Sequence, residues 1–298
     1  MAQTRNTLTI ILGPTAVGKT DYAIKLAKEI GSPILNCDSR QIFKELTIGT
    51  AVPSKEQLSE VKHYFIQTNS ITEHYTAGRY ELEALALLKE LFKEHNRIIM
   101  CGGSGLYIDA VCNGLDAFPE ADLKLRHTLN IRLKEEGLES LRYELKQLDP
   151  ESYAALDIAN PQRIVRALEV TLQTGKKFSE WKSGAKERPF AIEKIGLNME
   201  REKLYSRINQ RVDKMMSGGL LDEVKSLDHF RFVNGELKAD LEHIPSLRTV
   251  GYRELFDYLD GKTDLETAVE AIKMNTRRYA KRQVSYWGRD KSISWINL

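Results

Sequence analysis

The chain has 298 residues, 42% of them hydrophobic and 29% charged, and a formal net charge of +2 at pH 7. This composition describes an ordinary globular protein, and the length suffices for one large α/β domain with an insertion or for two modest domains. Because no apolar run reaches membrane-spanning length and the amino terminus lacks an apolar signal segment, we exclude a membrane protein and expect a cytoplasmic one.

Residues 13–20, with the sequence GPTAVGKT, follow an apolar run at 8–12 and precede a helical pattern that begins at residue 21. Strand, glycine-rich turn and helix are the context that the phosphate-loop pattern requires. Backbone N–H groups of such a turn favour phosphate, Lys19 adds a cation, and Thr20 adds a hydroxyl suited to Mg²⁺. The sequence therefore predicts a di- or triphosphate site made by Gly13, Pro14, Thr15, Ala16, Val17, Gly18, Lys19 and Thr20.

Further short apolar runs at 33–37, 98–101 and 192–199 predict buried strands. Between the first two of these, residues 76–95 predict a helix. Strands that alternate with helices predict an α/β fold, namely a P-loop-type doubly wound parallel sheet with helices on both faces. The core-facing stripe of the helix is expected to be Leu82, Leu85, Leu88, Leu91 and Phe92.

The pattern changes after residue 114, where polar helical segments follow without a strand candidate. We expect a small all-helical insertion at 116–159 and a catalytic core made of 1–115 and 160–298. The helix that follows has clear ends, since Asn160 and Pro161 suit its start and Gly175 suits its end. The expected apolar set of the insertion is Leu123, Leu125, Leu129, Leu133, Leu138, Leu141 and Leu145.

The polar cluster Asp38, Ser39, Arg40 and Gln41 follows the second strand. Parallel strands end on one rim, so this cluster should open into the same crevice as the phosphate loop. Asp38 is a candidate general base or second-shell magnesium ligand, and Gln41 a candidate reader of a base edge. A helix cap by Asp38 or Ser39 is an equally ordinary use of these residue types, and spacing alone leaves both open.

The third strand leads into Gly102, Gly103 and Ser104, where glycine allows close approach to a ligand and Ser104 offers a hydroxyl. A tight strand-to-helix turn would explain the same residues. P-loop ATPases and GTPases usually place an acidic residue near such a strand end to help hold Mg²⁺. Glycine stands there instead, which makes ordinary nucleotide hydrolysis less favoured.

Three scattered cysteines, Cys37, Cys101 and Cys112, lack metal-ligand spacing, and we expect small buried residues in a reducing compartment. Two arginine pairs, 163 with 166 and 207 with 211, each share a helix face. Either pair could clamp a phosphate or form ordinary surface ion pairs.

The segment 273–291 is rich in Lys and Arg, holds a single acid, and interleaves Tyr279, Tyr286 and Trp287. The net charge of +2 neither favours nor excludes a polyanionic partner, but this local distribution is typical of phosphate contacts combined with ring stacking. A plain basic helix remains the alternative.

Taken in order, the motifs of this chain resemble those of the bacterial tRNA dimethylallyltransferases, also called tRNA isopentenyltransferases. The resemblance extends from about residue 8 to 295. It implies transfer of a dimethylallyl group from dimethylallyl diphosphate to N6 of the adenine beside the anticodon, on its 3′ side, in tRNAs that read codons beginning with U. The matching segments are GPTAVGKT, DSRQIF, IGTAVP, YTAGRYELEA, GGSGLYIDAVCNG, DPESYA, NPQRIVRALEVTLQTG, RVDKMMSGGLLDEV, VGYREL and YAKRQVSYW.

The resemblance implies that residues 13–20 hold the donor diphosphate with Mg²⁺ as cofactor and Thr20 as its ligand. Asp38 would be the base near N6, with Lys19 and Arg211 beside the leaving diphosphate. The partner would be the anticodon stem-loop of tRNA, and we expect a monomer. The residues expected to contact tRNA are Asp38, Ser39, Arg40, Gln41, Ser104, Gln162, Arg163, Ile164, Val165, Arg166, Arg248, Gly251, Tyr252, Arg253, Arg278 and Arg282.

The chain departs from the family pattern at Phe43, Thr47, Val52 and 62–67. These positions cluster in the segment expected to cover the prenyl donor. They favour either altered donor affinity or a tRNA-binding paralogue with weakened catalysis. Prenylation of a free adenine nucleotide and an NTP-dependent small-molecule kinase are further alternatives.

Overall fold

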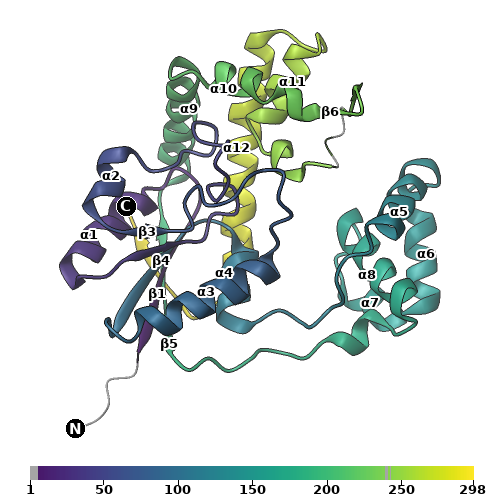
Figure 1. Ribbon diagram of the computed structural model, residues 1–298, viewed down its shortest axis with the longest axis horizontal. Coiled ribbons are helices and arrows are strands. Elements are labelled where there is room, and N and C mark those ends of the chain that lie inside the picture. Colours follow the sequence, from purple (N-terminus) through teal and green to yellow (C-terminus); the bar gives the residue numbers. More distant parts are fainter. Residues whose placement is uncertain (1–5, 239–240, 242) are drawn as a thin grey trace. The chain divides into compact units, whose positions relative to one another are not determined.

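The chain folds into two compact units, one formed by Met1–Cys112 with Arg188–Leu298 and the other by Asn113–Glu187. We call them the core unit and the helical unit. The computed structural model describes residues 6–238, 241 and 243–298 (Figure 1). No helix of the described residues is long and apolar enough to span a membrane.

Within the described residues the core unit is built on a six-stranded sheet whose paired strands are all parallel. The α/β fold and the four expected strands are confirmed. The two edge strands were not predicted, because one has only two residues and the other mixes polar with apolar side chains. In spatial order the strands are β3 (His63–Tyr64), β2 (Ile34–Asn36), β4 (Arg97–Cys101), β1 (Thr7–Leu12), β5 (Ala191–Asn198) and β8 (Ile293–Asn297).

Helices cover both faces of this sheet (Figure 1). Successive side chains of a strand point to opposite faces, so Ile10 packs into one apolar cluster and Ile11 into another. The first cluster includes residues of α3 and α4, and the second includes residues of α1 and α9. The helices of the core unit are α1 (Lys19–Ile30), α2 (Lys55–Glu60), α3 (Ala77–Leu91), α4 (Gly105–Asn113), α9 (Arg201–Ser217), α10 (Leu220–Ser226), α11 (Tyr252–Leu259) and α12 (Leu265–Trp287).

The expected buried stripe of α3 is partly wrong. Leu82 is 73% exposed, whereas Tyr80, Ala84 and Leu88 are fully buried. These three residues follow a spacing of four, which places them on one helix face. Leu82 lies off that face. The start of the helix is as expected, since Thr76 Oγ1 accepts a hydrogen bond from the backbone N–H of Arg79 at 3.1 Å.

A further apolar cluster joins α10, α11 and α12 to the segment after β2. In it Ile42 and Leu46 pack with Leu220, Tyr252 and Leu255, all of them buried. This cluster supports the loops that follow the carboxyl ends of the strands. Shorter elements of the chain are η1 (Phe178–Trp181), η2 (Asp228–Arg231), η3 (Pro245–Arg248), β6 (Phe232–Val233) and β7 (Glu236–Leu237).

The helical unit extends beyond the expected boundary at residue 159, because the next helix belongs to it. Ile164 and Leu168 of that helix pack against Leu129, Leu141 and Leu145 in one buried cluster. The expected capping residue, Asn160, accepts the backbone N–H of residue 162 at 3.1 Å. The expected apolar Leu123 is 66% exposed. The helices of this unit are α5 (Leu123–Glu135), α6 (Leu138–Leu148), α7 (Pro150–Ala155) and α8 (Pro161–Thr174).

Candidate active site

Two cavities of about 560 and about 530 Å³ open in the core unit, around the loops that follow β1, β2 and β4. We call the first the loop cavity, because residues of the phosphate loop line it. We call the second the aromatic cavity, because four rings line it, those of Tyr107, Tyr279, Tyr286 and Trp287. The residues that line both cavities are Thr15, Asp38, Thr50 and Arg211. Asp38 and Arg211 therefore stand at the boundary of the two.

The phosphate loop connects β1 to α1 as the sequence predicts. Gly13 lies against β5, where an added Cβ would stand 2.4 Å from the carbonyl oxygen of Leu197. Gly18 has a φ of 107° at the start of α1, a conformation that favours glycine. The Nζ of Lys19 donates to the carbonyl oxygens of Gly13 at 2.9 Å and Pro14 at 2.8 Å. An ammonium has three N–H groups, so Lys19 retains one for a ligand.

Cations gather on the α9 side of the loop cavity. Arg207, Arg211 and Lys214 of α9 all line it together with Lys19. The Nε of Arg207 donates to the carbonyl oxygen of Ala16 at 3.0 Å. Arg211 has no hydrogen bond or ion pair to another described residue, which leaves its guanidinium for a ligand. The cavity thus suits an anion that carries several negative oxygens.

Burial lowers the pKa of Lys19 and of Arg211, and the carboxylate of Asp38 opposes this shift in both. The two cations are thus held partly desolvated beside one acid. A bound anion would supply the charge that this environment lacks. This electrostatic arrangement supports the expected roles of Lys19 and Arg211.

Asp38 lies in a turn after β2, so the helix-cap alternative is wrong. Its Oδ1 accepts the backbone N–H of Arg40 at 2.9 Å and that of Gln41 at 3.4 Å. The Oδ1 of Asn36 accepts the N–H of Asp38 at 3.2 Å. Its other oxygen, Oδ2, has no hydrogen bond to the described residues. Asp38 therefore presents one fixed carboxylate oxygen at the boundary of the two cavities.

Ser104 joins the ends of β2 and β4. Its Oγ donates to the Oγ of Ser39 at 3.0 Å and accepts the backbone N–H of Ser39 at 2.9 Å. The Nε2 of Gln41 donates to the carbonyl oxygens of Thr50 at 3.0 Å and Ala51 at 2.9 Å. Gln41 thus holds the neighbouring loop, and its N–H groups are engaged there, not on a base edge as the sequence suggested.

Glu223 of α10 is a residue that the sequence reasoning missed. Its carboxylate accepts the backbone N–H groups of Thr47 at 3.2 Å, Ile48 at 2.8 Å and Gly49 at 3.1 Å. It also accepts the hydroxyl of Tyr252 at 2.6 Å. One carboxylate thereby fixes a loop that lines both cavities. The only signal in the sequence was an acidic residue inside a family motif.

Tyr252 was expected to contact tRNA, and the structure gives it another role. Its side chain is fully buried, and a Cβ on Gly49 would lie 2.5 Å from its ring. Gly251 is the N-cap of α11, and its N–H donates to the carboxylate of Glu254 at 2.8 Å. Arg253 is exposed and pairs with Glu254 at 2.8 Å. The ring and hydroxyl of Tyr252 therefore support the loop and are not available to an RNA.

Of the five residues of α8 that were expected to contact tRNA, some are exposed and others are buried. Gln162 and Arg163 are exposed. Ile164 and Val165 are 0% and 2% exposed within the apolar core of the helical unit, so their side chains cannot contact an RNA. Arg166 pairs with the buried Glu169 at 3.0 Å and donates to the carbonyl oxygen of Pro119 at 2.8 Å. The sequence motif mixes surface with core positions because it follows one helix through both.

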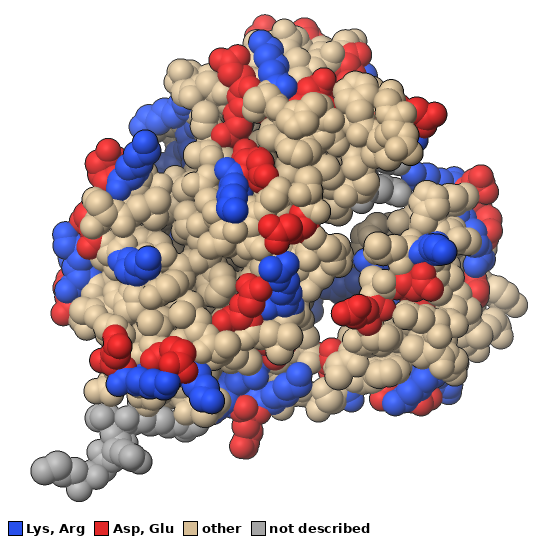
Figure 2. Space-filling model, viewed as in Figure 1, with Lys and Arg blue, Asp and Glu red and all other residues tan. Residues whose placement is uncertain are grey.

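The basic segment 273–291 also contains two kinds of residue, those engaged with α9 and those that are exposed. Lys273 pairs with Asp213 at 2.8 Å, and Arg277 donates to Asn209 at 2.6 Å, so both are engaged with α9. Arg278 and Arg282 are exposed. Arg282 lies 5.8 Å from the ring centroid of Tyr279, and both line the aromatic cavity, as Arg248 and Arg40 do. On the face shown in Figure 2, acidic and basic side chains are interspersed.

The departures from the family pattern lie near the loop cavity, which Val52, His63 and Ile66 line. Two of them contact each other, since the Nε2 of Gln67 donates to the Oγ1 of Thr47 at 2.8 Å. Burial lowers the pKa of His63. Phe43, by contrast, is 5% exposed and packs in the apolar cluster that includes residues of α10, α11 and α12, so only part of the departing segment lines that cavity.

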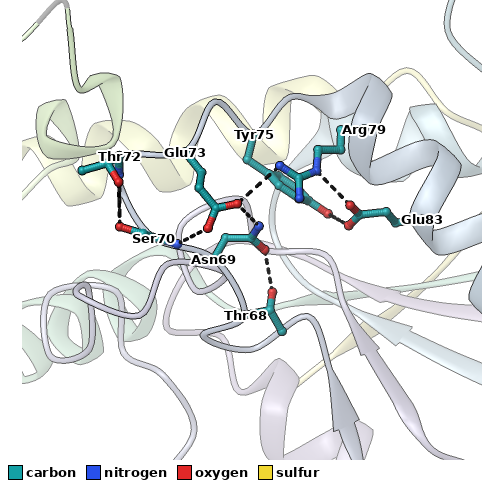
Figure 3. Close-up of polar contacts among 8 residues, drawn as sticks. All are labelled: Thr68, Asn69, Ser70, Thr72, Glu73, Tyr75, Arg79 and Glu83. Atoms are coloured by element: carbon teal, nitrogen blue, oxygen red, sulfur yellow. Dashed lines mark hydrogen bonds and ion pairs between the residues drawn. The ribbon is translucent and has the colours of Figure 1, made fainter.

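The chain between these positions and α3 is fixed by its own polar contacts (Figure 3). The carboxylate of Glu73 accepts from the side chain of Asn69 and the backbone of Ser70, both at 2.9 Å. Arg79 pairs with Glu83 at 2.8 Å, and the hydroxyl of Tyr75 donates to Glu83 at 2.6 Å. This network anchors residues 69–75, which follow the segment with His63 and Ile66, to the start of α3.

Among the described residues no group of three or more His, Cys, Asp or Glu is placed to hold a metal ion. Mg²⁺ usually binds through one or two protein ligands, phosphate oxygens and water. Thr20 and Asp38 line the loop cavity with a hydroxyl and a carboxylate. These donors fit an ion that binds together with a diphosphate. The three cysteines are free and buried, as expected.

Comparisons with known proteins agree with this geometry. A family model described as IPP transferase matches residues 41–290. The tRNA dimethylallyltransferase of Christiangramia forsetii is 48% identical over 294 residues, which cover 98% of this chain and 94% of that protein. The solved full-length tRNA isopentenylpyrophosphate transferase of Bacillus halodurans has a TM-score of 0.70 and 34% identity, covering 98% of this chain and 90% of that one. A eukaryotic dimethylallyltransferase acting on tRNA has a TM-score of 0.79 and 25% identity, covering 98% and 74%.

Proposed function

The chain belongs to the IPP transferase family, and on that premise we propose that it moves a dimethylallyl group from dimethylallyl diphosphate to a tRNA. The acceptor is N6 of the adenine that follows the anticodon in tRNAs reading codons beginning with U. One observation carries this proposal. A cationic cavity and an aromatic cavity share a boundary at Asp38 and Arg211.

The donor occupies the loop cavity. Backbone N–H groups of the phosphate loop and the amino terminus of α1 favour its diphosphate. Lys19 and Arg211 supply positive charge where negative charge develops as the allylic bond breaks. Mg²⁺, held by Thr20 and the diphosphate, would further neutralise the leaving group. Two observations support this assignment: no described residue pairs with the guanidinium of Arg211, and the two carbonyls that hold Lys19 leave one of its three N–H groups for a ligand.

The acceptor adenine occupies the aromatic cavity. A base in the anticodon loop must turn outward to meet the donor, and single-stranded loops allow this at modest cost. Rings such as Tyr279 and Tyr286 offer stacking surfaces. Arg248, Arg278 and Arg282 are exposed beside them and suit the phosphates of the stem-loop. The exposed Gln162 and Arg163 of the helical unit are further candidates for RNA contact.

The transfer forms a bond between N6 and C1 of the dimethylallyl group while the bond from C1 to the diphosphate oxygen breaks. The diphosphate leaves with the electron pair of that bond. N6 loses one proton, and the unpartnered Oδ2 of Asp38 accepts it. The turn hydrogen bonds to Oδ1 fix the orientation of this carboxylate. Asp38 thus acts as the general base. Our proposal further takes the enzyme to be a monomer that acts in the cytoplasm.

Deletion of the gene tests this proposal in the cell. Isopentenyl-adenine should vanish from the tRNA of the deletion strain and return on complementation. An unchanged level of the nucleoside in a clean deletion would contradict the proposal.

A comparison of acceptors separates the alternatives. AMP and an anticodon stem-loop should be offered to the enzyme with the same donor. We expect transfer to the stem-loop, because AMP lacks the chain of backbone phosphates that the arginines beside the aromatic cavity would bind. Preferred transfer to AMP would favour the free-nucleotide alternative, and ATP consumption without tRNA would favour a kinase.

A further inference from the structure

Gln283 of α12 connects three parts of the core unit through one amide group. Its Oε1 accepts the backbone N–H of Thr15 in the phosphate loop at 2.8 Å. Its Nε2 donates to the carbonyl oxygen of Gly103 in the turn after β4 at 2.9 Å. The side chain is 6% exposed. The phosphate loop, the β4–α4 turn and α12 are therefore joined by two buried hydrogen bonds.

The position of this amide matters because Thr15 lines both cavities. The N–H of Thr15 points to Gln283, so it is not one of the loop donors that face the diphosphate. The hydrogen bond fixes the peptide plane between residues 14 and 15. The carbonyl oxygen of Pro14 in that plane is one of the two that hold Lys19. Gln283 thereby orients the carbonyl that orients the cation.

The turn after β4 is shaped to admit Gln283. An added Cβ on Gly103 would lie 2.5 Å from the Nε2 of Gln283 and 3.8 Å from the Nζ of Lys19. The first contact is too close unless the amide moves, whereas the second is ordinary. Glycine at position 103 therefore leaves room for the amide of Gln283, and not merely for a tight turn.

We propose that Gln283 is a positioning residue for the prenyl donor, acting through Thr15 and Pro14 on the phosphate loop and Lys19. The inference rests on the proposed function of the loop cavity. It assigns to α12 a role on the donor side, in addition to the arginines and rings that α12 presents to the acceptor. Gln283 also lines the aromatic cavity. Both ends of its amide are engaged with backbone groups of Thr15 and Gly103, so its main effect should appear in donor binding.

Calorimetry with dimethylallyl diphosphate alone tests the inference on the full-length protein. Gln283→Met keeps the length of the side chain and removes both hydrogen bonds, and we expect it to weaken donor binding about 10-fold, the effect of losing buried hydrogen bonds. The affinity for an anticodon stem-loop should stay within about 2-fold of wild type. The matched control is Glu266→Ala, an exposed residue in the first turn of the same helix, which should change neither affinity.

A double-mutant cycle shows whether Gly103 acts through Gln283. Gly103→Ala should weaken donor binding because its Cβ displaces the amide. In a Gln283→Ala background the same change should have little further effect, since the clash is gone. Donor binding that Gln283→Met leaves unchanged, or additive effects of Gly103→Ala and Gln283→Ala, would overturn the inference. A wild-type protein that fails to bind the donor would overturn the proposed function itself, and the inference with it.

Discussion

The two cavities of the core unit share a boundary but differ in their chemistry. Cations and backbone N–H groups line the loop cavity, and tyrosine and tryptophan rings line the aromatic cavity. The first environment suits a leaving anion, and the second suits a flat, weakly polar base. Asp38 and Arg211 line both. Under the proposed function, the donor and the acceptor are recognised by separate surfaces and react only where those surfaces meet.

This difference between the cavities sorts the effects of substitutions. Changes in the loop cavity should alter donor affinity, and changes around the aromatic cavity should alter tRNA affinity. Changes at the shared boundary should lower the rate of transfer with smaller effects on either affinity. We expect the largest effects at that boundary and the smallest at positions that only support the surrounding loops.

Asp38→Ala should lower the rate of transfer on the order of 1,000-fold, because the proton of N6 loses its acceptor. The affinity for tRNA should change far less. Asp38→Asn is the sharper variant, since its amide oxygen still accepts the N–H of Arg40 and preserves the turn. Single-turnover kinetics and stem-loop binding on the same preparations measure both quantities. Equal losses in rate and tRNA affinity would reassign Asp38 to binding or folding.

Arg211→Gln should lower kcat/KM on the order of 100-fold, because a charge that stabilises the leaving diphosphate is lost. Stem-loop affinity should be nearly unchanged. Lys203→Ala on the same helix is a control, since that side chain is 69% exposed and, among the described residues, pairs only with Glu200. A defect confined to tRNA binding would place Arg211 on the acceptor side and break the proposed division.

Replacing Arg278 and Arg282 together with Ala should weaken stem-loop binding about 10-fold. The slope of the logarithm of the binding constant against the logarithm of the salt concentration should become shallower by about one for each phosphate that is no longer bound. Donor affinity should not change. Binding titrations from low to high salt measure the slope. An unaltered slope would return this part of α12 to the status of a plain basic surface.

Glu223→Gln should destabilise the protein by about 1–3 kcal/mol, because an amide replaces one of the carboxylate oxygens that accept three backbone N–H groups. The loop at 47–49 would loosen, so both affinities should fall modestly. Urea unfolding measures the stability, with Asp222→Asn on the same helix as an exposed control. If only the donor affinity or only the stem-loop affinity fell, the loop would support only the corresponding cavity.

His63 should make stability depend weakly on pH. Burial lowers its pKa below the ordinary value of 6.5, so the unfolded chain binds the proton more readily. The neutral histidine therefore contributes stability above pH 6.5 that is lost as pH falls towards its folded pKa. His63→Gln should lose less stability than wild type between pH 7 and pH 5. Identical pH profiles in urea unfolding would contradict this.

Local patterns predicted the parts of the fold that depend on neighbours in sequence. The phosphate loop, the central strands and the cap at Asn160 follow from glycine placement, apolar runs and a side-chain oxygen. The two-residue strand β3 carries no periodic signal and was missed. The helix α8 was assigned to the core because its caps show where a helix begins and ends, but not what it packs against.

Motif residues that line a cavity or are exposed stay candidates for the site, whereas motif residues whose side chains are buried in an apolar core were mispredicted. Asp38 and Arg211 stand at the cavity boundary, whereas Ile164, Val165 and Tyr252 are buried. A motif records which residues occur together and does not distinguish contact with a ligand from support of a loop. Glu223 and Gln283 act through hydrogen bonds to distant backbone groups, which no spacing in the sequence reveals.

The central claim is that a donor in the loop cavity reacts with a base in the aromatic cavity across Asp38. Purified protein with labelled dimethylallyl diphosphate and an anticodon stem-loop tests it most directly. We predict that the label appears on N6 of the adenine next to the anticodon, with one diphosphate released for each transfer. Tight binding of the stem-loop with no transfer of label would contradict the account.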